Sequence, residues 1–200
     1  MATSKARAYY ALVSRLRRAG LPFSSELPDS DFGPYDVVLT TAEEAGKFGK
    51  RALALEELDE NPGVFKCQVI SRIKEGDLIL VGIDPGKRTG VAIFYGQTKV
   101  TFNTFDSAGA VWSRVGAFAR GVPSSRLLVR VGNGNRPMAS KLVDGLRREV
   151  PAATIEVVDE SGTSAGGPKM KGVQRDQAAA AKIAFRKGVV VKYGTTRTRD

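Results

Sequence analysis

The chain contains no histidine among its 200 residues. Mechanisms that depend on an imidazole base are therefore excluded, including Ser-His-Asp and Cys-His arrangements, and so is histidine-ligated zinc. The single cysteine, Cys67, cannot build a disulfide framework or a zinc site. Any hydrolytic chemistry must therefore come from carboxylates, lysines and metal ions.

Long apolar runs are also absent. No run approaches the roughly 18–20 residues needed to cross a bilayer. Residues 1–5 lead into a charged, helix-like segment rather than an apolar signal stretch. Hydrophobic residues make up 42% of the chain, which is close to the ordinary globular share and predicts a buried core. We therefore expect a soluble, cytoplasmic protein.

Positive charge is in excess. The chain has 31 Lys and Arg against 21 Asp and Glu, which gives a formal net charge of +10. A basic surface of this size attracts polyanions, because neutralising phosphates releases their counterions. The charge therefore favours a nucleic-acid partner. The alternatives are a protein charged only for solubility and one that sits on an anionic membrane.

The first part of the chain has short helical and extended patterns. Apolar residues at helical spacing over 5–19 predict an amphipathic helix with a basic outer side. Thr41 and Glu44 form a capping-box pair that predicts the start of a second helix. Extended segments are expected at 36–40 and 64–73. We therefore predict a small, basic α+β domain over residues 1–75, of a type that the sequence does not define.

A second pattern begins at residue 76. Apolar runs and turn residues predict three consecutive strands, then a helix, a strand, a helix, a strand and a final helix. The strands are expected at 78–83, 90–95, 99–105, 126–131 and 154–158, and the helices at 107–120, 137–149 and 173–187. This order predicts an α/β domain over residues 76–190, with a mixed five-stranded sheet and flanking helices. Residues 191–200 are expected to form a basic tail.

Three acidic residues adjoin buried elements. Asp84 ends the first apolar strand before a Pro-Gly turn, and Glu160 follows the last strand. Asp176 shares the face of the final helix on which Ala180 and Ile183 are expected to be buried. An isolated buried charge is costly, so these positions suggest ligands or partners. The structural alternatives are a turn-forming role for Asp84 and a dipole-stabilised cap for Asp176.

Carboxylates that converge at the ends of strands suit hard divalent cations. Mg²⁺, or Mn²⁺ in its place, takes carboxylate oxygens and keeps several waters for substrate phosphates. Two such ions about 3.5–4 Å apart activate a water and stabilise the leaving oxygen of a phosphodiester. This chemistry needs no histidine, in agreement with the composition.

Three segments carry a resemblance to a known family. Residues 82–92, GIDPGKRTGVA, resemble the first-strand motif of the RuvC/YqgF branch of the RNase H-like nucleases. Residues 158–164, VDESGTS, are similar to the Asp-Glu-Arg-x-Thr-Thr signature of the YqgF type. Residues 176–180, DQAAA, resemble the aspartate and small residues that begin the family's last helix. The resemblance covers about residues 78–188.

The resemblance implies an RNase H-like fold and a metal-dependent phosphodiesterase. It implies that Asp84, Glu160 and Asp176 are the catalytic residues and the ligands of Mg²⁺ or Mn²⁺. The chain is closer to the YqgF type than to RuvC resolvases, because residues 131–135, VGNGN, lack the glutamate that resolvases carry there. Ser161 stands where the YqgF signature has arginine.

Basic residues are expected around the same edge of the sheet. We expect them to contact phosphates, which positions a strand without reading its sequence. The alternative is that they are solvated loop charges. These residues are Lys87, Arg88, Lys169, Lys171 and Arg175.

Three functions are compatible with these patterns. The first is a Mg²⁺-dependent endonuclease that acts on structured nucleic acid, either ribosomal RNA precursors or branched DNA such as a Holliday junction. A junction resolvase would be a homodimer, because it cuts two strands symmetrically. The second is a non-catalytic RNA- or ribosome-binding protein with the same fold. The third is a sugar-kinase or ATPase-like protein, for which the chain is short.

Overall fold

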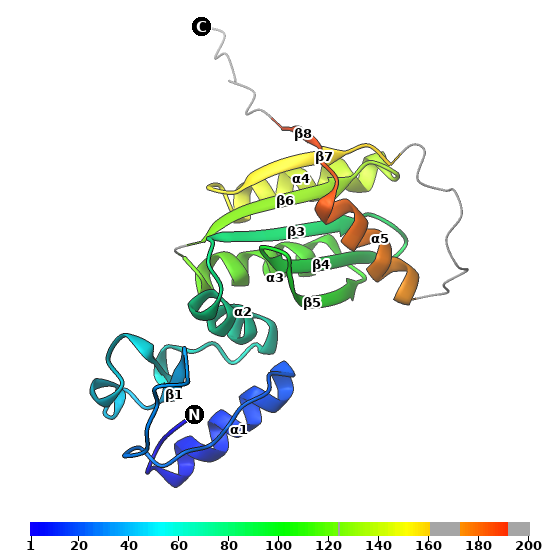
Figure 1. Ribbon diagram of the computed structural model, residues 1–200. Helices are drawn as coiled ribbons and strands as arrows, with labels where there is room; N and C mark the ends of the chain where they lie inside the picture. Colours follow the sequence, from blue (N-terminus) through cyan, green and yellow to red (C-terminus); the bar gives the residue numbers. More distant parts are fainter. Residues whose placement is uncertain (124, 161–172, 192–200) are drawn as a thin grey trace, which may run out of the picture. The chain divides into compact units, whose positions relative to one another are not determined.

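The computed structural model describes residues 1–123, 125–160 and 173–191. The chain forms two compact units, which are described separately. The first contains Met1–Asp77 and Arg120–Ser124, and the second contains Leu78–Ala119 and Ser125–Asp200. Figure 1 shows the elements of both. Within the described residues, no helix is long and apolar enough to span a membrane.

The first unit is built on two helices and a small parallel sheet. Helix α1 (Ala6–Ala19) buries one apolar face, and α2 (Pro62–Ile73) packs beside it. Strands β1 (Val38–Thr40) and β2 (Ala52–Ala54) pair in parallel. Three short 3₁₀ turns complete the unit: η1 (Ala45–Lys47), η2 (Gly49–Arg51) and η3 (Leu55–Glu57). The core includes Leu12, Leu16, Leu39 and Phe65.

Helix α2 corrects the prediction of an extended segment at 64–73. The side chain of Asn61 caps the helix, since its Oδ1 accepts hydrogen bonds from the backbone N–H groups of Gly63 (3.0 Å) and Val64 (3.4 Å). Pro62 occupies the first turn, where its fixed φ suits a helix. The valines and isoleucines that suggested a strand are held in the helix by tertiary packing, which overrides their intrinsic preference.

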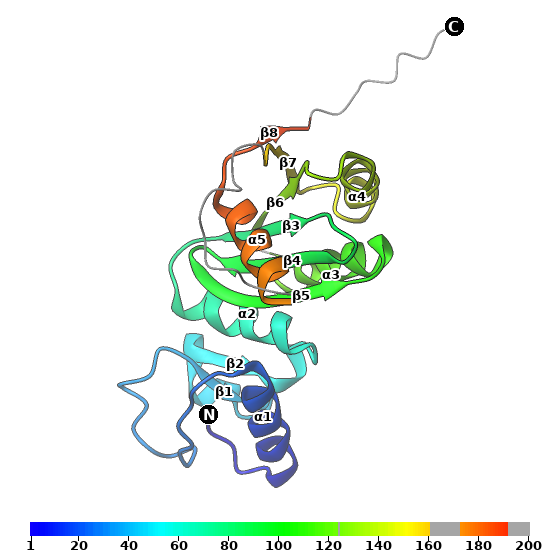
Figure 2. The same cartoon turned by 90° about the vertical axis from the view of Figure 1, so that its right-hand side faces the viewer.

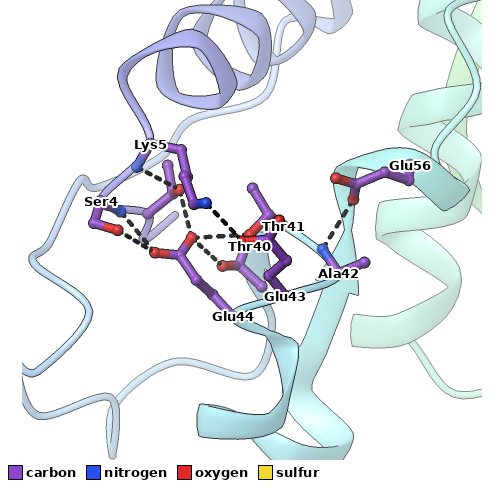
Figure 3. Close-up of polar contacts among 9 residues, drawn as sticks. Ser4, Lys5, Thr40, Thr41, Ala42, Glu43, Glu44 and Glu56 are labelled. Atoms are coloured by element: carbon purple, nitrogen blue, oxygen red, sulfur yellow. Dashed lines mark hydrogen bonds and ion pairs between the residues drawn. The ribbon is translucent and has the colours of Figure 1, made fainter.

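Glu44 also has a different role from the predicted one. The chain after Thr41 forms 3₁₀ turns instead of the expected helix, so the capping-box prediction was wrong. The Glu44 carboxylate instead accepts hydrogen bonds from Ser4 (N, 2.9 Å; Oγ, 2.6 Å), from Thr3 Oγ1 (2.5 Å) and from Thr41 Oγ1 (3.0 Å) (Figure 3). It therefore joins the segment before α1 to the segment after β1.

The hydrogen bonds determine the charge state of Glu44. Burial alone would raise the pKa of this carboxyl group, because it disfavours the charged form. The bonds from Ser4, Thr3 and Thr41 outweigh burial and lower the pKa from 4.5 to about 2. Glu44 is therefore a buried carboxylate that stays ionised at neutral pH.

Replacing Glu44 by Gln is expected to destabilise the first unit by about 2–3 kcal/mol at pH 7, because charge-assisted hydrogen bonds are lost. The folded pKa is lower than the unfolded one, so this stabilisation is complete above about pH 4.5 and disappears as the pH falls toward 2. Amide hydrogen exchange in α1 measures the effect. Glu43→Gln, which removes only an exposed ion pair to Lys5, is the matched control. Equal exchange in the two variants would contradict the assignment.

The second unit is a mixed six-stranded sheet in the order β5-β4-β3-β6-β7-β8. Three antiparallel strands come first in the chain; β6 then pairs in parallel with β3, and β7 pairs in parallel with β6. The strands are β3 (Leu78–Asp84), β4 (Thr89–Tyr95), β5 (Thr98–Phe105), β6 (Arg126–Gly132), β7 (Thr154–Val158) and β8 (Val189–Val190). The mixed α/β class agrees with the prediction, but the predicted number of five strands was wrong. The sixth strand, β8, has only two residues, which is too short for a recognisable pattern.

Three helices cover this sheet. Helices α3 (Ala108–Gly121) and α4 (Arg136–Glu149) lie on one face, and α5 (Val173–Phe185) lies on the other (Figure 2). The contacts of α5 are mainly with β3 and β4. Strand side chains alternate between the two faces of a sheet, so only alternate residues of β3 and β4 face α5. The size of these residues determines how closely α5 approaches the end of β3.

Candidate functional site

Asp84 is the last residue of the central strand β3. On one side it pairs with Gly90 of β4, and on the other side the last registered pair is Ile83 with Val131 of β6. One step further along that register, Gly132 lies next to Asp84. Asp84 is therefore flanked on both neighbouring strands by glycines, and the space above these glycines is occupied by other parts of the chain.

Asp176 is brought to Asp84 by the close approach of α5 to β4. A Cβ atom built on Gly90 would lie 2.6 Å from the main-chain oxygen of Asp176, which is closer than a real side chain allows. Asp176 lies in the first turn of α5, and its side chain is 20% exposed. The absence of a side chain at position 90 is thus what allows this helix to begin beside Asp84.

Glu160 approaches Asp84 from the side of the neighbouring strand β6, over Gly132. A Cβ atom at position 132 would overlap Glu160 Oε1, so a larger residue there would displace this carboxylate from its present position. The backbone N–H of Gly134 donates a hydrogen bond of 3.0 Å to the same oxygen. Glu160 therefore lies against the chain that follows β6, next to the end of the central strand.

Asn133 holds Glu160 in this position. Its Oδ1 accepts a hydrogen bond from the Glu160 backbone N–H (3.0 Å), and its own backbone N–H donates to Val158 O (3.0 Å). Its Nδ2 donates to Asp159 Oδ1 (3.2 Å). The Gly-Asn-Gly segment at the end of β6 thus holds the residues after β7 in place through hydrogen bonds. Its sequence alone did not predict this role.

The three predicted site carboxylates interact electrostatically. Burial is the largest cause that raises the pKa of Asp84, and the negative charges of Glu160 and Asp176 raise it further. Arg175 acts in the opposite direction, but the pKa still rises from 3.8 to about 6. Asp84 is therefore a carboxyl group whose ionisation is opposed by the site around it, which a cation would relieve.

The donor chemistry fits a hard divalent cation, because all three groups are carboxylates with oxygen donors. The raised pKa of Asp84 points the same way, since burial and then the charges of Glu160 and Asp176 oppose its ionisation and a cation would favour it. The positions of the three side chains fit a metal site less well than their chemistry does. Across residues 1–123, 125–160 and 173–191, no three acidic, histidine or cysteine side chains form a group arranged to hold a metal ion.

The predicted basic residues are only partly described. Lys87 is exposed in the turn after Asp84. Arg88 points toward β5, where its Nη2 donates to Thr104 Oγ1 (2.7 Å) and its Nε lies 3.3 Å from Asp106 Oδ1. Arg175 precedes Asp176, and its Nε lies 3.8 Å from Asp176 Oδ1. The other two predicted residues, Lys169 and Lys171, lie outside the described residues.

A buried ion pair that the sequence analysis missed secures the other end of α5. Arg130 Nε lies 2.8 Å from Glu156 Oε2, and the two side chains are only 14% and 11% exposed. Arg130 Nη1 also donates to the Ala184 carbonyl near the end of α5 (2.7 Å). The signal in the sequence was a charged residue between apolar residues in the interior of each of the two strands, Arg130 in β6 and Glu156 in β7.

Similarity to known proteins adds nothing to this site. No protein-family model and no curated protein sequence matches the chain. Its function must therefore be inferred from the residues and their arrangement.

Replacing Asp84 by Asn is expected to stabilise the second unit at pH 7.5 by about 1–2 kcal/mol, allowing for the partial exposure of the group. The folded pKa exceeds the unfolded one, so the folded state binds more protons between pH 3.8 and 6, and stability falls as the pH rises through this range. The gain should therefore disappear near pH 4. Urea unfolding followed by Trp112 fluorescence measures it. Asp144→Asn on α4 is the control, and a loss of stability in Asp84→Asn at pH 7.5 would refute the account.

Removing the charge of Glu160 is expected to lower the pKa of Asp84 from about 6, because one of the two repelling carboxylates is gone. The measurement is a pH titration of the Asp84 carboxyl carbon by NMR in Glu160→Gln. Asp144→Asn should leave this pKa unchanged. If the Asp84 pKa were the same in Glu160→Gln as in the unaltered chain, burial alone would explain it and the two groups would not form one site.

Proposed function

We propose that the protein is a Mg²⁺-dependent endonuclease of the RuvC/YqgF type with an RNase H-like second unit. Mn²⁺ would serve in place of Mg²⁺. The observation that carries the proposal is the raised pKa of Asp84 at the end of the central strand, which burial causes first and the negative charges of Glu160 and Asp176 increase. Such perturbed groups concentrate at functional sites.

The topology of the second unit supports the proposal. A meander of three antiparallel strands is followed by two crossovers that each pass through a helix to a parallel strand. This is the order of elements that the resemblance of residues 82–92, 158–164 and 176–180 implies. Asp84 ends the first strand of the meander, and the strand before Glu160 is the last parallel one.

In this proposal Asp84, Glu160 and Asp176 would hold the cation. The bound cation would activate a water molecule and stabilise the leaving oxygen of the phosphodiester. Lys87 and Arg175 have positions from which they can bind phosphates of the substrate backbone. Arg88 is engaged with Thr104 and Asp106, so its contribution to binding would require release from these partners.

The substrate class is structured nucleic acid, for which the net charge of +10 gives general affinity. The YqgF-like features favour ribosomal RNA precursors, and the resemblance to resolvases favours branched DNA such as a Holliday junction. The second case requires a homodimer, because two strands must be cut symmetrically.

A non-catalytic RNA- or ribosome-binding role is the alternative. It is favoured by the finding that, in the described parts of the chain, the carboxylates form no group arranged to hold a metal ion. Ser161, which replaces the arginine of the YqgF signature, favours it as well. This role requires salt-dependent binding without divalent-dependent turnover.

Cleavage of a structured RNA and of a four-way DNA junction tests the proposal. With Mg²⁺ we expect cleavage of one substrate, abolished by EDTA and reduced at least about a hundredfold by Asp84→Asn, because the cation loses a ligand. Asp144→Asn should cleave normally. Binding without cleavage of either substrate would support the non-catalytic alternative, and cleavage unaffected by Asp84→Asn would overturn the assignment of the site.

A further inference from the structure

The outward face of α1 in the first unit has an unusual composition. The helix buries Ala8, Leu12, Leu16 and Ala19. The opposite side, which we call the α1 outer face, is formed by five exposed residues at helical spacing: Arg7, Tyr10, Ser14, Arg17 and Arg18. The helix Ala6–Ala19 contains no acidic residue. Its exposed surface is therefore basic and aromatic, with no negative charge of its own.

The arginines of the α1 outer face are available for a partner. Within the part of the chain that the structure describes, Arg7, Arg17 and Arg18 have no ion pair. Arg15 differs, because its Nη1 donates to the carbonyls of Leu55 (3.2 Å) and Leu58 (2.6 Å) and is thereby used in the fold. The outer-face arginines are therefore not needed to hold α1 in place.

Tyr10 adds an aromatic ring to the same face. It is 73% exposed and meets Tyr9 in an edge-to-face contact with the ring centroids 5.8 Å apart. Arg7 precedes it by one helical turn, and Arg17 follows it by two turns. At about 1.5 Å per residue, Arg7 and Arg18 are about 17 Å apart along the helix axis. The cations therefore lie on both sides of the Tyr10 ring, along a length that corresponds to several nucleotides of a strand.

We propose that the α1 outer face binds unpaired nucleic acid. The arginines would contact backbone phosphates, and the Tyr10 ring would stack on a base, which is available only where the strand is unpaired. This interaction is separate from the Asp84 site and does not require that the protein cleaves its partner. It gives the first unit a role in capturing single-stranded segments of a structured nucleic acid.

The burial of the helix argues against a membrane surface as the partner. Amphipathic helices bind membranes by inserting their apolar face between lipids. In α1 this face is already in the core of the first unit, where Leu12 and Leu16 are at most 2% exposed. The outer face presents only cations, a hydroxyl group and an aromatic ring, which together match the chemistry of a nucleotide strand.

The test is binding of a fluorescein-labelled oligouridylate of about 20 nucleotides to the full chain in EDTA, at several salt concentrations. Each phosphate contact to a single strand contributes about 0.7 to the slope of log K against log salt. The triple variant Arg7→Gln, Arg17→Gln, Arg18→Gln should therefore reduce the magnitude of the slope by about 2. Glutamine retains good helix propensity, so α1 should remain folded, and the melting temperature checks this.

A charge-matched variant separates local contact from general electrostatics. Lys50→Gln, Lys74→Gln and Lys141→Gln together remove the same charge from exposed positions outside α1. We expect this control to keep most of the slope. Equal losses of slope in the two triple variants would overturn the proposal, because the affinity would then follow net charge alone.

Tyr10 tests the stacking step. Tyr10→Ala should weaken binding roughly 5- to 140-fold, whereas Tyr10→Phe, which keeps the ring, should bind almost normally. Fully paired RNA should show no such difference. The stacking assignment fails if Tyr10→Ala binds as tightly as Tyr10→Phe. If the chain binds an acidic polypeptide such as polyglutamate with the same dependence on the outer face, the partner is an acidic protein and the nucleic-acid proposal is wrong.

Discussion

The repulsion of negative charge around Asp84 is the interaction on which the proposed function of the second unit depends. Glu160 and Asp176 act on a group that burial already disfavours as an ion, and its pKa rises to about 6 as a result. In a protein built for stability alone, a neutral residue at position 84 would serve better, because the ionised group opposes folding at neutral pH. In the proposed function, a bound cation would compensate this negative charge.

The surrounding structure places these charges around the end of the central strand, where Glu160 and Asp176 act on Asp84. Gly90 and Gly132 have no side chains that would exclude the helix backbone or the Glu160 carboxylate. Asn133 fixes the backbone at Glu160, and the buried Arg130 bonds the carbonyl near the far end of α5. The candidate site thus depends on contacts at both ends of one helix and at the ends of two parallel strands.

The sequence predicts the parts of the fold that have long, continuous patterns. Strands β3 to β7 combine apolar runs with turn residues, and their order alone indicates a mixed sheet. Helix α2 was missed because its β-branched residues favour a strand locally, and its Asn61 cap acts only once the chain is folded. The three acidic residues stand out in the sequence. The hydrogen bonds of Asn133 and the packing of Glu160 against Gly132 are tertiary contacts, which no local sequence pattern predicts.

The central claim is that Asp84, Glu160 and Asp176 share one cation. Paramagnetic broadening by Mn²⁺ tests it most directly, because the effect falls steeply with distance from the ion. In the carbon NMR spectrum of the full chain, substoichiometric Mn²⁺ should broaden the carboxyl resonances of these three residues first and together, before that of Asp144. Broadening that spreads evenly over exposed acidic side chains, or that spares Asp84, would contradict the account.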